Sequence, residues 1–178
     1  MESTPGGIEN TVTPAQLLVD GFERVRQVVL HTLTGLSPEQ LAFAPAPGAN
    51  TIGWLTWHLT RVQDDHVADV AGSEQVWTGD GWFERFGLPL DSSDTGYGHR
   101  PEQVSAVRVP SAQLLIDYHQ AVFEQSRHYL SGLTESDLAR VVDDSWDPPV
   151  TLGVRLVSVL SDDLQHAGQA GYLTGLVR

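Results

Sequence analysis

Three side chains that could hold a metal ion lie close together near the C-terminal end of the sequence. Asp162, Asp163 and His166 interrupt the segment LVSVLSDDLQHAGQAGYLTG, residues 156–175, whose apolar residues otherwise recur at helical spacing. Burial of acids and an imidazole costs free energy unless they pair, hydrogen-bond or bind a metal. Residues three or four apart project from one helix face, about 6 Å from each other. The spacing therefore predicts two ligands of one metal ion, with either aspartate as the carboxylate beside His166.

A third ligand must come from another helix, and the segment GWLTWHLTRVQDDHVADV, residues 53–70, offers two histidines. His66 falls well inside the apolar face of this segment, and His58 borders it. The two are eight residues apart, which is about 12 Å along a helix axis, so one metal ion cannot easily take both. Periodicity leaves the choice between them open.

Four helical segments must position these residues. The first begins with Thr13 as N-cap and Pro14 at the first helical position, and closes at Gly35. The second spans about 51–71, the third begins at Ser111 and ends at Gly132, and the fourth spans about 152–176. These segments predict an all-α, four-helix bundle. No stretch predicts a strand convincingly; VSAVRV, residues 104–109, is the nearest.

A long connection joins the second and third helices and is rich in glycine, proline and aromatic residues. Because this connection, residues 72–110, is too short for a core of its own, we expect it to lie over the bundle or a partner subunit. The rest of the chain contains an internal echo. HTLTGLSPEQLA (31–42) resembles HYLSGLTESDLA (128–139), and TIGWL (51–55) resembles TLGVR (151–155). The echo favours two similar helical hairpins.

The composition excludes several classes of function. The formal net charge is −13, with only 10 lysines and arginines, so the surface repels nucleic-acid phosphates. There is no cysteine, so metal ligands must be nitrogen or oxygen and any reacting thiol must be external. No apolar run approaches the ~20 residues of a membrane span. The start, MESTPGGIEN, does not resemble a signal peptide. We expect a cytoplasmic protein with a mobile tail at residues 1–10 and one domain over 11–178.

The chain resembles the DinB-like superfamily, which includes mycothiol-dependent maleylpyruvate isomerases and related actinobacterial thiol transferases. The resemblance rests on TIGWLTWHL, the GYGH loop, the third helix that ends at glycine, and DDLQHAGQAGYL. It implies a four-helix bundle of DinB-like type, a homodimer, and a divalent metal ion. The implied ligands are His58, Asp162 and His166. Aspartate departs from the commoner histidine or glutamate at position 162, and its shorter reach keeps Asp163 open as the alternative.

Other polar residues are expected to have structural roles. We expect His66 to be packed or hydrogen-bonded, His119 to lie on a solvated face, and Arg61 to pair with Asp64 or Asp65.

Three ligands leave a coordination position open, which is typical of a catalytic metal. Zinc is the expected ion, with nickel, iron and manganese as alternatives. The resemblance implies a thiol-dependent S-transferase or isomerase, in which mycothiol or another low-molecular-weight thiol attacks a small electrophile. The alternatives are a metal-hydroxide hydrolase and a non-catalytic metal-binding protein of the stress response. The sequence shows no separate nucleophile or base.

Overall fold

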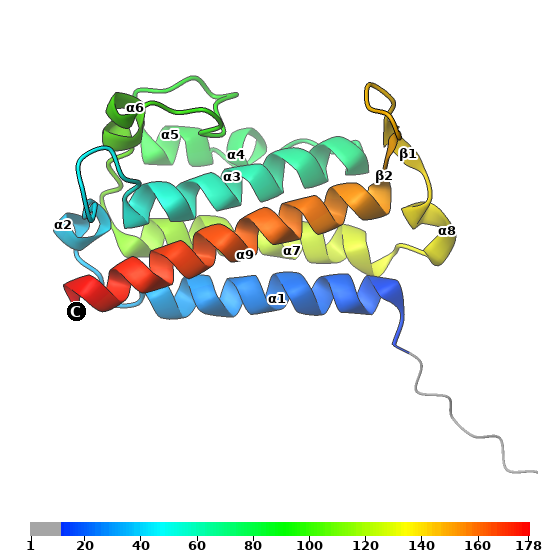
Figure 1. Ribbon diagram of the computed structural model, residues 1–178, viewed down its shortest axis with the longest axis horizontal. Coiled ribbons are helices and arrows are strands. Elements are labelled where there is room, and N and C mark those ends of the chain that lie inside the picture. The colour runs from blue at the N-terminus through cyan, green and yellow to red at the C-terminus, as the bar shows by residue number, and fades with distance from the viewer. Residues whose placement is uncertain (1–11) are drawn as a thin grey trace, which may run out of the picture.

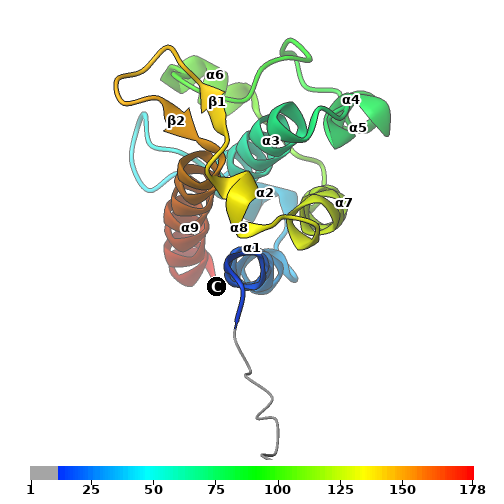
Figure 2. The ribbon, with the colours of Figure 1, turned by 90° about the vertical axis from the view of Figure 1, so that its right-hand side faces the viewer.

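Four long helices make up most of the part of the chain that the structure, a computed structural model, describes: residues 12–178 (Figure 1). They are α1 (Pro14–Leu33), α3 (Ile52–Ala71), α7 (Ala112–Ser131) and α9 (Leu152–Val177). Helices α1 and α3 each pack against both α7 and α9. Seen end-on, α3 and α1 therefore lie at opposite corners, with α7 and α9 at the other two (Figure 2). The predicted all-α class is confirmed. The tail predicted at 1–10 lies outside the described residues, and the single domain over 11–178 stays a prediction.

Side-chain caps set the start of each long helix where the sequence placed it. Thr13 and Gln16 form a reciprocal capping box on α1, and Thr51, Ser111 and Thr151 each accept a backbone N–H from the first turn of their own helix. Helix α3 is capped at its C-terminal end by Gly72, whose φ of 65° is in the left-handed region. Among residues 12–178, no helix is apolar and long enough to cross a membrane.

The connection between α3 and α7 lies over the other helices and forms no core of its own. It contains the short helices α4 (Val76–Gly79), α5 (Trp82–Phe86) and α6 (Pro101–Ala106). Trp77, Trp82 and Phe86 pack around the buried ring of Tyr118 on α7. Because this cover adds to the packing of α3 against α7 and α9, every residue from Thr51 to Arg61 is buried. His58, which the sequence placed at the border of the apolar face, is therefore also inside the protein.

A short antiparallel hairpin precedes α9, where the sequence predicted no strand. Strand β1 (Val141–Asp143) pairs with β2 (Val150–Thr151), with Val141 opposite Thr151. Strands of three and two residues are too short to show an alternating pattern, so the prediction was wrong here. Residues 104–106 of the VSAVRV stretch instead belong to α6.

The two halves predicted from the internal echo have matching local structure. The short helices α2 (Pro38–Leu41) and α8 (Glu135–Leu138) occupy equivalent places before α3 and α9. A Cβ added at Gly53 would lie 3.2 Å from the carbonyl oxygen of Leu41, and one at Gly153 would lie 3.3 Å from that of Leu138. The glycine in each half therefore lets a short helix approach the first turn of the following long helix.

Candidate metal centre

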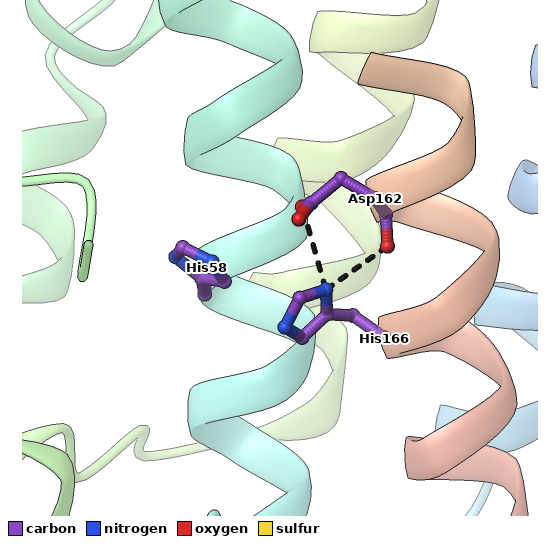
Figure 3. Close-up of side chains that lie close together, drawn as sticks. All are labelled: His58, Asp162 and His166. Carbon is purple, nitrogen blue, oxygen red and sulfur yellow. Dashed lines mark hydrogen bonds and ion pairs between the residues drawn. The ribbon is translucent and has the colours of Figure 1, made fainter. Parts of the chain in front are cut away.

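The structure brings His58 of α3 together with Asp162 and His166 of α9. One potential ligand atom of each residue lies within 4.8 Å of the other two, and this is the one group of three such residues found in the described part of the chain. Figure 3 shows the three side chains at the junction of the two helices. His66, the other candidate on α3, does not belong to the group.

His58 is held from behind by the loop that follows α5. Its Nδ1 lies 2.5 Å from the carbonyl oxygen of Thr95, and its ring stacks on Trp54 at 4.6 Å between ring centroids. A carbonyl oxygen can only accept a hydrogen bond, so Nδ1 carries the proton and Nε2 keeps its lone pair. His58 is therefore fixed in the tautomer that a metal ligand requires.

His166 is oriented in the same way by its own helix. Its Nδ1 lies 2.9 Å from the backbone oxygen of Asp162 and 3.3 Å from Oδ2 of the same residue (Figure 3). Its Nε2 is again the nitrogen left for a metal ion. Oδ2 of Asp162 is buried, and its polar neighbour is Nδ1 of His166, which it shares with the backbone oxygen of the same residue. Such an atom needs a compensating charge, and a cation bound between the two imidazoles would supply one.

The electrostatics of the group favour one negative charge and one neutral imidazole. Burial lowers the pKa of His58, and the neighbouring His166 adds to this effect, against the hydrogen bond to Thr95. Burial also lowers the pKa of His166, but its hydrogen bonds to Asp162 outweigh burial, so the net shift is upward. Burial raises the pKa of Asp162, and the hydrogen bond and charge of His166 more than offset it. Asp162 is thus an anion beside the donor nitrogens.

Asp163 does not join the group, although the sequence left it open as the carboxylate. Its side chain is fully buried, and neither oxygen has a hydrogen-bond partner. Burial, with the charge of Asp162 second, raises its pKa well above the ordinary value. The geometry therefore favours Asp162 over Asp163.

A network in the crossover loop, which the sequence did not reveal, supports His58. His99 accepts a hydrogen bond from Nε1 of Trp54 at 3.1 Å and donates through Nε2 to the Asp94 carboxylate at 2.9 Å. The same carboxylate accepts the backbone N–H of Gly96 at 2.7 Å. This network fixes the loop on which the Thr95 carbonyl is presented. The GYGH sequence was the available signal, but nothing in its spacing pointed to Trp54.

Three other polar residues have structural roles, one of them contrary to expectation. His66 hydrogen-bonds to Arg155 at 3.1 Å, and the buried Arg61 lies 3.5 Å from Asp64, both as predicted. His119 was predicted on a solvated face and is instead buried between the helices. There its Nδ1 forms a hydrogen bond with the hydroxyl of Thr60 at 3.1 Å. Burial lowers its pKa to about 4.

A cavity of about 570 Å³ adjoins the three residues. It runs between α3, α9, the loop around Thr95 and the β1–β2 hairpin, and His58 and Asp162 are among the residues that line it. The candidate centre is therefore accessible to a small molecule.

Comparisons with known proteins identify the family of the chain and support its fold. A family model described as the DinB superfamily matches residues 21–170. The crystal structure of a conserved protein from Enterococcus faecalis is similar, with a TM-score of 0.87 and 34% sequence identity over 94% of this chain and 98% of that one. No curated protein matches the chain. Because the family model covers most of the chain, this protein belongs to the DinB superfamily.

Proposed function

We propose that the protein binds a divalent metal ion, with zinc as the expected ion, through His58, Asp162 and His166. The observation that carries this proposal is that backbone carbonyls hold both imidazoles by Nδ1, so that both Nε2 atoms remain for a metal beside a carboxylate. Ligand atoms on a tetrahedral zinc ion are about 3.3 Å apart. Since the present atoms lie within 4.8 Å, movements of about 1.5 Å within side-chain range would complete the site.

We further propose that the bound metal serves a thiol-dependent transferase or isomerase related to the mycothiol-dependent enzymes. Three protein ligands leave an open position, and a metal there would lower the pKa of an external thiol so that its sulfur is nucleophilic at neutral pH. The chain contains no cysteine that could compete for the metal or supply the nucleophile. The cavity beside His58 and Asp162 gives space for the thiol and an electrophile.

In this reaction the chain's own residues position the metal ligands and cover part of the site. Thr95 and the Asp162 backbone hold the two imidazoles, while Trp54 stacks on one face of the His58 ring. The hydroxyl of Ser158, which lines the cavity, donates to the backbone oxygen of Val154 and not to a basic side chain, which suits a thiol from solution as the nucleophile. The same arrangement would also serve a metal-bound hydroxide, so hydrolysis is the alternative activity.

Metal analysis of the protein purified without a histidine tag tests the first step. We expect one divalent ion per chain, and its loss in His166→Ala with unchanged helical circular dichroism. His128→Ala is the matched control, because His128 lies far along α7, near its C-terminal end. A parent protein that takes up no ion from excess zinc, cobalt or nickel would refute the metal site.

Spectroscopy of the cobalt-substituted protein tests the second step. A physiological thiol bound at the open position should give a sulfur-to-cobalt charge-transfer band. Hydrolysis of esters or amides without such a band would favour the hydrolase. The absence of both with cobalt bound would favour a non-catalytic metal-binding protein of the stress response.

A further inference from the structure

The cavity beside the candidate metal centre has a second polar end. His58 and Asp162 line it beside the candidate centre, and His66 and Arg155, about two turns away along α3 and α9, line it as well. Arg155 and Asp162 are both on α9, seven residues apart, so they project from the same face about 10 Å from each other along the axis. A ligand that reaches both ends must therefore be about 10 Å long.

Arg155 is held in place but keeps hydrogen-bond donors for a ligand. Its Nη2 donates to Oδ2 of Asp143 at 3.0 Å, and its Nη1 donates to Nδ1 of His66 at 3.1 Å. A guanidinium group has five N–H donors in a planar fork, so these two contacts leave most of them uncommitted. The Asp143 carboxylate is shared, because it also accepts from the backbone and hydroxyl of Ser145. Arg155 is thus oriented without being fully neutralised.

The charges around the cavity make anion binding at this end depend on the metal. Three carboxylates line the cavity, from Asp65, Asp143 and Asp162, against the single charge of Arg155. A divalent cation beside Asp162 would balance this excess, and the cavity would then tolerate one further negative charge near Arg155. A carboxylate with one charge fits a planar guanidinium better than a phosphate dianion, which would also meet Asp65 and Asp143.

Between Arg155 and Asp162 the cavity wall is mostly apolar. Val62 and Val159 line this part together with Ser158, and two exposed aromatic residues also line the cavity. Trp146, in the β1–β2 hairpin, is 65% exposed, and Tyr97, in the opposite loop, is 92% exposed. Large aromatic side chains left in solvent beside a cavity are typical of a contact surface for an apolar ligand. Figure 1 shows the hairpin standing beside the start of α9, where Arg155 lies.

We propose that Arg155 forms a carboxylate subsite, and that the protein binds an elongated molecule with a metal-binding atom at one end, an apolar middle and a carboxylate at the other. This assignment rests on the metal centre proposed above. It deepens that proposal by naming the class of ligand: an ω-substituted carboxylic acid whose carboxylate lies about 10 Å from the metal-binding atom.

A series of thiols of equal length tests this subsite on the cobalt-loaded protein. The probes are 6-mercaptohexanoate, the neutral 6-mercaptohexanol and the cationic 6-aminohexanethiol, with binding followed by the charge-transfer band. We expect the acid to bind about tenfold more tightly than the alcohol, and the amine more weakly than both. The shorter 3-mercaptopropionate should show less advantage over its own alcohol, because it cannot span both ends.

Variants separate the subsite from the metal centre. Arg155→Gln should abolish the preference for the acid and leave binding of the alcohol unchanged, with Arg155→Lys intermediate. Arg127→Gln is the matched control, since Arg127 is a surface residue on α7 whose ion pair with Glu124 is remote from the cavity. Thermal unfolding of each variant checks that it folds.

The outcomes distinguish the two proposals. Equal binding of acid and alcohol to the parent protein, or tighter binding of the amine, would overturn the carboxylate subsite while the metal centre stands. If cobalt binds but no thiol band appears, the same acid and alcohol are compared by calorimetry, and equal binding again overturns the subsite. A protein that binds no cobalt overturns both.

Discussion

Gly96 is the residue at which a single methyl group should disturb the candidate metal centre most directly. Its φ is +90°, and an added Cβ would lie 2.8 Å from Nδ1 of His58, 3.0 Å from Trp57 and 3.2 Å from Trp54. The first of these atoms carries the hydrogen bond to Thr95. Gly96→Ala must therefore push apart the loop and the imidazole that it holds.

The expected effect of Gly96→Ala has two parts, a loss of stability and a loss of metal affinity. Alanine with a positive φ costs about 1–2 kcal/mol wherever it occurs. Crowding against a packed imidazole and two indoles adds about 1–3 kcal/mol. Loss of a hydrogen bond that orients a metal ligand typically lowers metal affinity by about 10- to 100-fold. We expect Gly96→Ala to show the sum of both stability terms and this loss of affinity.

Gly98→Ala is the matched control. Gly98 has a φ of +70° in the same loop, but nothing lies within 4 Å of the position of an added Cβ. Gly98→Ala should lose only the stability that an alanine with positive φ costs, and it should keep its metal affinity. Chemical denaturation and competition with a chelator measure the two quantities. Equal metal affinity in the two variants would refute the reasoning that Thr95 and Gly96 position His58.

Three further predictions follow from the buried groups and from the surface of α9. Asp162→Asn should lower metal affinity by about tenfold or more, whereas Asp163→Asn should leave it nearly unchanged. Isothermal titration calorimetry measures both affinities, and the reverse order would make Asp163 the ligand. The pKa of His119 is about 4 in the folded protein, against an ordinary value of 6.5. Its contribution to stability is therefore complete above pH 6.5 and is lost as the pH falls towards 4. The loss amounts to about 3 kcal/mol. His119→Leu should flatten that part of the curve of unfolding free energy against pH, and an unchanged curve would contradict the assignment. The homodimer stays a prediction. Every exposed residue of α9 from Val154 to Leu176 is uncharged, so Leu164→Glu should dissociate a dimer formed through this face. Sedimentation equilibrium measures the mass, and a parent protein that is already monomeric would contradict the dimer.

The long helices and the pairing of Asp162 with His166 could be predicted because their signals are local. Caps such as Thr13 and Thr151 act within one turn, and Asp162 and His166 face the same way because of helical geometry alone. The choice of His58 over His66 needed the resemblance to a family, since periodicity favoured neither.

The features that the sequence did not reveal depend on contacts between distant segments. The hydrogen bond from Trp54 to His99 joins residues 45 positions apart, and the bond between Thr60 and His119 joins residues 59 apart. Whether a histidine such as His119 is buried depends on which helix faces it, and a helical wheel describes only one helix. The β1–β2 hairpin was missed for a different reason, because its strands contain too few residues for any pattern.

The matching halves of the fold have a consequence for the history of the cavity. With the offset of 100 residues that relates Thr51 to Thr151, His58 corresponds to Ser158, Asp162 to Val62 and His166 to His66. Val62, His66 and Ser158 all line the same cavity as His58 and Asp162. If the halves arose by duplication of one helical hairpin, the ancestor placed two equivalent sites at the two ends of one cavity, related by a two-fold axis. One end has kept three donor residues, whereas the other has kept only its histidine and has gained an arginine where the first half has Leu55. Divergence of two copies would thus have turned a symmetric site into one that can distinguish the two ends of its ligand.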